Sequence, residues 1–452
     1  MEREKLATRL GFIMVSAGCA IGVGNVWRFP YIAGKNGGAA FVIIYLIFLV
    51  ILGLPVMISE FAIGRASRKN LAGAIRALEP KGTRWHIYGY AGILGNLVLM
   101  MFYTMIAGWF FGYLYHIVRG DLTGLSAEGV GSFFNTFVSS TPEVTGWMAL
   151  TVFVGFFVCA IGLQNGVERV TKFLMMGLLA MMIILVFRAV TLPNAAEGVL
   201  FYLMPDFSKM GWNTIYDAMG QAFFTLSLGM GSMTIFGSYV SKERTLVGES
   251  INVLILDTFV AIMAGMIIFP TCASFGVNVA EGPGLIFVAL PNIFNSMSAG
   301  RFWGILFFLF MTFAAMTTVI AVFENLVAFM MDEFDLKRKK SVLIGGIVVF
   351  VASLPCILGF GPWSSFQPFG AGSGILDLED FIVSNNLLPL GSMIIVLFCS
   401  LRIGWGWDRF REEANTGKGI KLPAWAKPYF KYVLPVIMLI VFVMGYISKF
   451  GL

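Results

Sequence analysis

The chain has 452 residues, of which 58% are apolar and 12% are charged, against roughly 25% charged residues in an ordinary soluble domain. With a mean hydropathy of +0.84, this composition excludes a soluble domain and is typical of a helical membrane protein with many spans. The five cysteines lie in or beside apolar segments and only two histidines are present. We therefore expect neither a disulfide framework nor a histidine-based metal or acid–base site.

A span needs roughly 20 mostly apolar residues. This criterion predicts an all-α polytopic membrane protein with eleven spans: 10–34, 38–63, 89–117, 147–162, 168–190, 212–240, 248–275, 301–331, 341–359, 376–401 and 429–449. Segment 276–300 is too short and interrupted to span, and we expect a helical lid over the outer entrance there. The predicted organisation is an N-terminal segment (1–9), a first five-helix set (10–190), an extracellular connection (191–211), a second five-helix set (212–401), a cytoplasmic loop (402–428) and a last helix with an extracellular C-terminus (429–452).

Lysine and arginine are distributed unevenly between the predicted loops. Segment 118–146 carries only Arg119 and segment 360–375 carries neither residue, whereas basic residues gather in 3–9, 65–84, 242–244, 337–340 and 402–427. Because cytoplasmic loops are enriched in Lys and Arg, the sequence predicts a cytoplasmic N-terminus in the inner (plasma) membrane. The net charge of +6 is then an orientation signal, so the predicted partner is the lipid bilayer and not nucleic acid.

Two predicted spans are interrupted at their middle. Ala17–Phe29 reads AGCAIGVGNVWRF in the first, and Phe223–Met233 reads FFTLSLGMGSM in the sixth. Unwound backbone survives in hydrocarbon only where protein, water or a ligand satisfies it, and paired interrupted helices are typical of a transporter's central site. Each set of five helices begins with a broken helix. Because five is an odd number of spans, the second set should be inverted in the membrane relative to the first. The alternative is that the glycines only allow close helix packing.

An interrupted helix offers two kinds of ligand at mid-membrane. Free N–H groups near Val23 and Gly24 suit an anion. Freed carbonyls suit an alkali cation, and they are expected at Gly18, Ala20 and Ile21. Side-chain oxygens of Asn25, Thr225 and Ser227 lie nearby in the sequence, so an amphoteric small molecule with an accompanying ion is the simplest ligand.

Ionisable residues inside spans indicate function by default because they are expensive in hydrocarbon. The predicted spans contain Glu60, Asp257 and Glu324, with Arg28 just outside the first break. Two ion pairs are expected: Arg28 with Asp380 at the outer side, and Arg3 with Asp332 or Glu324 at the inner side. The alternative is that such pairs only fix helix ends. Tyr103, Phe102, Phe224 and Met230 are expected to be pocket walls only because they accompany the break, and in isolation they would count as ordinary core.

The chain resembles the neurotransmitter:sodium symporters, of the leucine-transporter fold, over nearly its whole length. The resemblance is carried by GCAIGVGNVWRFPY (Gly18–Tyr31), NGGAAF (Asn36–Phe41), GLPVMISEFAIGR (Gly53–Arg65) and GQAFFTLSLGMGSM (Gly220–Met233). The eleven-span form is similar to bacterial carriers of hydrophobic amino acids. It implies two inverted repeats of five helices plus one additional helix, with helices 1 and 6 unwound.

The resemblance implies two sodium sites and a substrate site. The first sodium site would use Ala20, Asn25, Thr225 and Asp257, and the second Gly18, Ile21, Ala314, Thr317 and Thr318. The substrate carboxylate would meet the N–H groups of Val23 and Gly24 and the Tyr103 hydroxyl, and its amine would meet Ala20, Phe224, Thr225 and Ser227. Tyr103 and Phe224 would form the outer lid below Arg28 and Asp380, and Arg3, Tyr239 and Asp332 would close the inner side. Leu99, Met230, Val319 and Val322 should line an apolar side-chain pocket.

Three departures from the family pattern refine this prediction. Gly22 stands where monoamine carriers place an Asp, which favours an amino acid over an amine. Asp257 stands where the family usually has Asn, and a fixed carboxylate there predicts chloride independence. In helix 5 the family often has a Gly, nine residues and then a Pro, but after Gly166 the position of that proline is occupied by Met176. A residue with an N–H can keep its helical bond, so unwinding of this helix should be less favoured than with Pro.

The predicted function is therefore sodium-driven symport of hydrophobic amino acids by alternating access. A cation channel would need a continuous polar pore, which Tyr103 and Phe224 are expected to plug. A carrier of another small zwitterion stays open as an alternative. A membrane enzyme would need paired acidic motifs, whereas the acids in the predicted spans are isolated.

Overall fold

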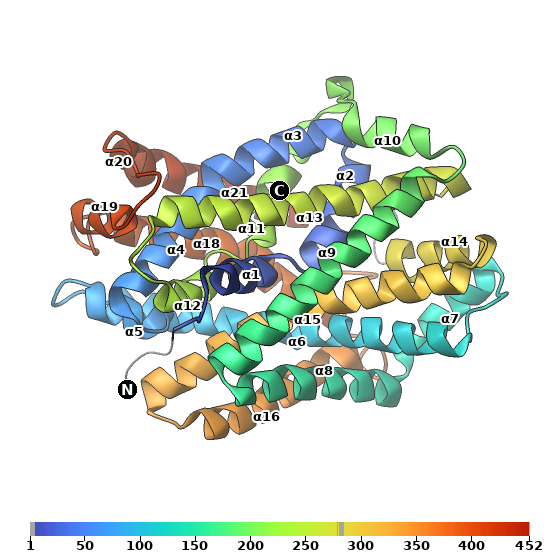
Figure 1. The fold of residues 1–452 in the computed structure, drawn as a ribbon, viewed down its shortest axis with the longest axis horizontal. Helices are drawn as coiled ribbons and strands as arrows, with labels where there is room; N and C mark the ends of the chain where they lie inside the picture. Colours follow the sequence, from blue (N-terminus) through green and yellow to red (C-terminus); the bar gives the residue numbers. More distant parts are fainter. Residues whose placement is uncertain (1–4, 278, 280–283, 452) are drawn as a thin grey trace.

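The protein is described here by a computed structural model that covers residues 5–277, 279 and 284–451. The predicted gate residue Arg3, and positions 278 and 280–283 of the predicted lid, lie outside this range. Figure 1 shows a bundle of long helices whose long axes run mostly in one direction, with the short connecting helices gathered at its two ends.

Within the described range, nine helical segments are long and apolar enough to cross a membrane. They are Ala39–Ser67 (α3 and α4), His86–Arg119 (α6), Thr141–Ile161 (α8), Leu163–Val190 (which includes α9), Leu246–Phe275 (α13), Gly300–Phe334 (α15), Arg338–Gly359 (α16), Ile375–Ser400 (α17 and α18) and Ala426–Phe450 (α20 and α21). A tenth span is formed by Arg9–Ala20 (α1) and Gly24–Lys35 (which ends in α2), whose axes differ by 56°. The remaining predicted span, 212–240, consists of Trp212–Thr225 (α11) and Ser232–Tyr239 (α12).

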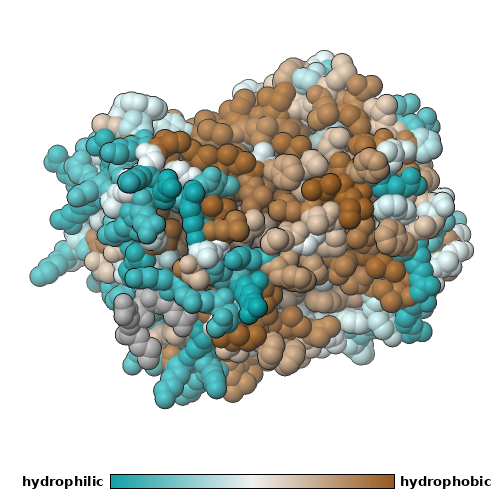
Figure 2. Space-filling model, in the orientation of Figure 1, coloured by the Kyte–Doolittle hydropathy of each residue, from teal (hydrophilic) through white to brown (hydrophobic). Residues whose placement is uncertain are grey.

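On the face that Figure 2 shows, apolar side chains form a broad band between two polar ends. One polar end contains Leu71–Leu78 (α5) and Trp407–Asn415 (α19), and the other contains Ala127–Ser139 (α7), Ala195–Leu203 (α10) and Leu290–Ser296 (α14) (Figure 1). Helix α14 lies in the segment for which a helical lid is predicted. The short helices α5, α7, α10 and α19 were not predicted from the sequence.

Six short segments of the described part of the chain are π-helical, and five of them have a common cause. Each of the five ends two residues before a proline: Gly24–Arg28, Leu49–Gly53, Leu285–Ala289, Phe381–Leu387 and Tyr429–Val433 precede Pro30, Pro55, Pro291, Pro389 and Pro435. Proline has no N–H and its ring crowds the carbonyl four residues earlier, so a widened turn lets the helix continue through it.

The fifth span lacks the motif proline, and its helix is continuous there. Helix α9 runs from Arg169 to Val190 through Met176 and Gly177, without an interruption. The irregular part of this span is instead the π-helical turn Leu163–Glu168, which follows Gly162 at φ 113°.

Candidate functional site

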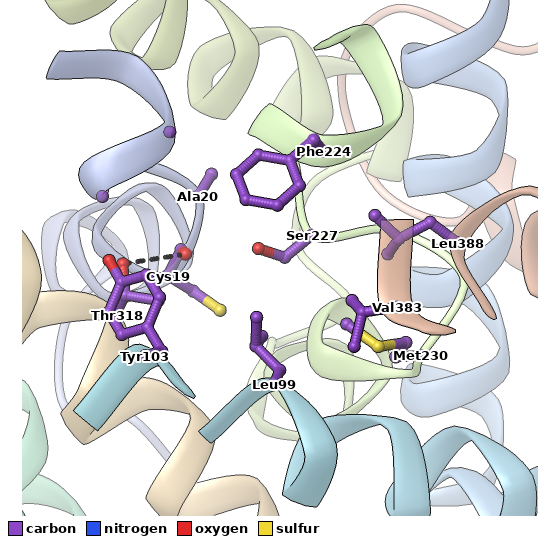
Figure 3. A pocket seen from close by; sticks show the side chains of 12 residues that line it. Cys19, Ala20, Leu99, Tyr103, Phe224, Ser227, Met230, Thr318, Val383 and Leu388 are labelled. Atoms are coloured by element: carbon purple, nitrogen blue, oxygen red, sulfur yellow. Dashed lines mark hydrogen bonds between the residues drawn. The ribbon is translucent and has the colours of Figure 1, made fainter. Parts of the chain in front are cut away.

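The two helix interruptions and three neighbouring spans enclose a small central cavity of about 20 Å³. Figure 3 shows its polar end at Tyr103, Cys19 and Thr318, with Ser227 and Phe224 at the middle and apolar side chains at the other end. The lining residues are Cys19, Ala20, Gly22, Gly24, Leu99, Tyr103, Phe224, Ser227, Met230, Thr318, Val383 and Leu388.

The first interruption is short and its polar groups meet neutral partners. Helix α1 ends at Ala20, and Ile21 takes an extended conformation. The Val23 N–H donates to the Tyr103 hydroxyl over 3.1 Å, and the Gly22 N–H donates to Asn25 Oδ1 over 3.3 Å. A Cβ atom on Gly22 would lie 2.4 Å from the Tyr103 oxygen, so the structure leaves no room for a side chain at this position.

The second interruption is longer and is held by a buried carboxyl group. Residues 226–231 separate α11 from α12. Both oxygens of Glu60 accept backbone N–H groups, from Gly229 at 2.6 Å, Met233 at 3.0 Å and Thr234 at 3.2 Å. Two of these donors belong to the first turn of α12, where N–H groups have no intrahelical partner, so Glu60 caps that half-helix.

Two further side chains fix the same segment. The Asn96 amide donates to the Met230 carbonyl over 2.8 Å and accepts from the Ser232 hydroxyl over 2.9 Å. The Tyr88 hydroxyl donates to the Gly229 carbonyl. The backbone of the second interruption is therefore satisfied from α4 and α6 by the protein itself.

The three side chains predicted for the first sodium site, Asn25, Thr225 and Asp257, are joined by hydrogen bonds beside the first interruption. Asn25 donates to Asp257 Oδ1 over 2.8 Å, and the Thr225 hydroxyl donates to Asp257 Oδ2 over 3.2 Å. Ala20 is the last residue of α1, so its carbonyl has no intrahelical partner. The amide, hydroxyl and carboxylate oxygens of Asn25, Thr225 and Asp257 are a donor set that suits a hard cation.

The residues predicted for the second sodium site form a separate cluster of oxygens. The Thr317 hydroxyl lies 3.2 Å from the Ile21 carbonyl and 2.9 Å from the Ala314 carbonyl. The Thr318 hydroxyl lies 3.3 Å from the Gly18 carbonyl and 3.4 Å from the Ile21 carbonyl. The contacts with Gly18 and Ile21, at 3.2–3.4 Å, join the end of α1 to α15 through neutral groups.

Two aromatic rings separate the central cavity from a second, wider cavity. Tyr103 and Phe224 line both, and the second cavity has a volume of about 370 Å³. Arg28 lies over the Phe224 ring at 4.1 Å from its centroid and 3.8 Å from Asp380. It also donates to the Ser384 hydroxyl over 3.3 Å. The predicted outer lid and the charged pair above it are thus adjacent in space.

At the opposite side, the predicted gate residues join two networks. The Tyr239 hydroxyl donates to Glu324 Oε1 over 3.0 Å, and Arg338 binds both Glu324 oxygens at 2.8 and 3.0 Å. Asp332 accepts the backbone and side-chain N–H groups of Asn70 at 2.8 and 3.0 Å. Sequence reasoning did not identify Arg338 as the partner of Glu324, although the charge lies at the start of the next helix.

Two of the four residues predicted for the apolar side-chain pocket line the central cavity. Leu99 and Met230 line the central cavity, but Val319 and Val322 are not among its lining residues. A Cβ built on Gly155 would lie 3.0 Å from Val319 Cγ1, so Val319 faces α8. Cys19, Val383 and Leu388 line the cavity and were not predicted, and the proline at 389 was the available signal for an irregular helix beside the site.

The comparisons with known proteins agree along the whole chain. Residues 3–130 and 132–450 match the model of the sodium:neurotransmitter symporter family. An uncharacterized sodium-dependent transporter of Bacillus subtilis, YhdH, is 35% identical over 442 residues, which are 96% of each chain. An uncharacterized sodium-dependent transporter of Haemophilus influenzae is 34% identical over 454 residues, or 98% of each chain.

A solved structure has the same architecture. The crystal structure of MhsT in complex with L-phenylalanine matches with a TM-score of 0.88 and 38% identity, over 98% of this chain and 100% of that chain. Fold and cavity together define a multi-pass membrane transporter with a central site between two broken helices. The chain belongs to the sodium:neurotransmitter symporter family. Its leucine-transporter fold and its sodium-coupled transport are those predicted from the sequence, and the family is one of transporters and not of enzymes.

Proposed function

We propose that this transporter imports hydrophobic L-amino acids together with sodium by alternating access. The observation that carries the proposal is the central cavity, which joins a hydrogen-bonding end to an apolar end without a charged side chain in its lining. The binding of L-phenylalanine by the related MhsT supports the same substrate class.

The proposed substrate orientation follows from the polarity of this cavity. The carboxylate would replace the contact between the Val23 N–H and Tyr103, and would lie beside Gly24 at the start of the second half-helix. The amine would meet carbonyls at the ends of α1 and α11, from Ala20, Phe224 and Thr225, and the hydroxyl of Ser227. Gly22 supports an amino acid over an amine because a carboxylate side chain does not fit there.

Two sodium ions would bind at the two oxygen clusters. The first ion would lie among Ala20, Asn25, Thr225 and Asp257, close to the substrate carboxylate, and the second among Gly18, Ile21, Ala314, Thr317 and Thr318. A ligand shifts a conformational equilibrium only through its differential affinity for the two states. Sodium must therefore bind the outward-facing or occluded form more tightly than the inward-facing form.

The proposed gates lie on either side of the cavity. Tyr103, Phe224 and the Arg28–Asp380 pair would close the outer side, and Tyr239, Asp332 and Arg3 the inner side, with the N-terminus in the cytoplasm. Asp257 would supply the negative charge for which other carriers need chloride, so replacing chloride with gluconate should leave uptake unchanged. Uptake that stops in gluconate would contradict this part of the proposal.

The testing experiment is equilibrium binding of labelled leucine and tryptophan to the purified protein, in sodium and in potassium. We expect saturable binding in sodium that other hydrophobic amino acids displace and that potassium does not support. Equal binding in both salts would contradict the sodium sites. Absence of binding in both salts would contradict the substrate class and favour another small zwitterion.

A further inference from the structure

The apolar end of the central cavity is closed by the tenth span. Figure 3 shows Val383 and Leu388 beside Met230, with Leu99 close by, away from the polar end at Tyr103 and Thr318. Val383 is fully buried and Leu388 is 2% exposed, and both line the cavity. If the carboxylate of the substrate lies at the polar end, the side chain of the substrate extends toward Val383 and Leu388.

The sequence explains why this span presents both side chains to the cavity. Pro389 removes one backbone donor, and the preceding turn, Phe381–Leu387, is π-helical. A π-helical turn contains one more residue than an α-helical turn and changes the direction of the side chains that follow it. Val383 lies within the widened turn and Leu388 is the first residue after it.

The surrounding backbone leaves little freedom at this end. A Cβ on Gly229 would lie 2.5 Å from the Leu388 carbonyl oxygen, so the second interruption packs directly on α18. A Cβ on Gly95 would lie 2.9 Å from both Leu387 Cδ1 and the Met230 sulfur. Helix α6, the segment 226–231 and the tenth span are therefore in close backbone contact beside the cavity, and its side chains set the size of its apolar end.

We propose that Val383 and Leu388 determine substrate specificity by setting the largest side chain that the site accepts. This inference rests on the proposed function, since it assigns the side-chain end of the same site. It adds to the sequence-based assignment of Val319 and Val322, which lie on α15 and are not among the residues that line this cavity. Met230, a flexible side chain between Leu99 and α18, adapts the space to substrates of different shape.

The inference is tested by competition between amino acids for sodium-dependent binding of labelled leucine and labelled phenylalanine. Competitors of increasing size, alanine, valine, leucine, phenylalanine and tryptophan, are compared in Val383→Ala, Leu388→Ala and Leu388→Phe. A change of one methylene in an apolar pocket alters discrimination by about 10-fold or more. We expect the two Ala variants to improve tryptophan relative to valine by about 10-fold, and Leu388→Phe to exclude tryptophan while alanine and valine still bind.

Ile382→Ala is the matched control, because Ile382 precedes Val383 on the same turn but is 36% exposed. Its order of affinities should equal that of the unaltered protein. An unchanged order in the three variants at 383 and 388, with a changed order in Val319→Ala or Val322→Ala, would overturn the inference and leave the proposed function intact. Absence of sodium-dependent binding by the unaltered protein would instead contradict the proposed function itself.

If an Ala variant does not bind either label, Leu388→Val and Val383→Ile provide milder changes of opposite sign. Leu388→Val should shift the order toward larger competitors, and Val383→Ile toward smaller ones. The same order in both variants would contradict the assignment. The opposite shifts cannot arise from a general loss of stability, because destabilisation weakens all competitors together.

Discussion

Both interrupted helices leave backbone polar groups without helical partners, but different chemical groups satisfy them in the two places. In the first, residues between α1 and the following half-helix meet hydroxyl and amide groups, at distances of 3.1–3.4 Å from Tyr103, Asn25 and Thr318. In the second, Glu60 accepts three N–H groups at 2.6–3.2 Å. Neutral, long contacts can be exchanged for a ligand, whereas a buried carboxyl group with three donors holds the chain in place. The first interruption is thus suited to binding a ligand, and the second to holding the backbone beside the site in a fixed conformation.

The largest expected effect is that of removing the carboxyl group from the second interruption. Glu60→Ala leaves three buried N–H groups without an acceptor, at about 1–3 kcal/mol each, which is comparable to the whole stability of a typical domain. We expect little folded protein, measured by thermal unfolding and by size-exclusion chromatography in detergent. Glu60→Gln keeps one acceptor oxygen, so its unfolding temperature should lie between those of the unaltered protein and Glu60→Ala. If Glu60→Ala unfolds at the same temperature as the unaltered protein, Glu60 does not hold the second interruption in place, and the two interruptions do not differ in this way.

A smaller loss is expected from a backbone change in the same segment. Gly229 has φ 89°, and a Cβ there would meet the Leu388 carbonyl. Gly229→Ala should cost about 1–3 kcal/mol, because a residue with a side chain is strained in this conformation. Gly220→Ala is the matched control, since Gly220 lies within α11 with no atom within 4 Å of its added Cβ. The control should unfold at or above the original temperature, and equal losses in both variants would show that the segment does not depend on this glycine.

At the first interruption we expect an effect on ion binding and not on folding. Thr318→Val removes the hydroxyl that contacts the Gly18 and Ile21 carbonyls. Losing about 1.4 kcal/mol of sodium binding would raise the half-saturating sodium concentration about 10-fold. The order of amino-acid affinities should not change. The measurement is leucine binding over a range of sodium concentrations.

Thr312→Val provides the control for that titration on the same helix. The Thr312 hydroxyl donates to the Phe308 carbonyl of its own helix, so its removal should leave the sodium dependence unchanged. If Thr318→Val also leaves it unchanged, the second sodium site has been assigned to the wrong residues.

The sequence predicted the spans and both interruptions because their signals are local. Runs of apolar residues and glycines in hydrocarbon depend only on residue type along one segment. The five π-helical turns were predictable in the same way from Pro30, Pro55, Pro291, Pro389 and Pro435, yet this signal was not used. The short helices α5, α7, α10 and α19 were not predicted because they are too short for a hydropathy criterion.

The walls of the site were harder to predict because they depend on which helices pack together. Met230 was predicted from its place beside the second interruption and Leu99 from the family resemblance, whereas Val383 and Leu388 reach the cavity through the path of the tenth span. Val319 and Val322 are as apolar as these two and lie on a helix next to the site, but they are not among the residues that line the cavity. Composition cannot distinguish these cases, and helix rotation decides them.

The smallest expected effect lies far from both interruptions, at the end of α6. His116 contacts Asp121 through Nδ1 at 2.6 Å and Glu143 through Nε2 at 2.7 Å. Each contact places an imidazole nitrogen against a carboxylate oxygen, which can only accept a hydrogen bond. His116→Ala should lower the temperature of thermal unfolding by about 2 °C at most, since partly exposed ion pairs contribute little, and should leave sodium affinity unchanged.

The pH dependence of that small loss identifies its origin. The hydrogen bond from His116 lowers the pKa of the Asp121 carboxyl group. A carboxyl group with a lowered pKa in the folded state stabilises the protein above its ordinary pKa of about 3.9 and loses this effect as the pH falls through the lowered value. The difference between the unaltered protein and His116→Ala should therefore persist from pH 7 to about pH 4 and shrink below it. A difference that stays constant down to pH 3 would mean that the loss comes from the aromatic packing of His116 against Tyr115 and Phe133, and not from its ion pair with Asp121.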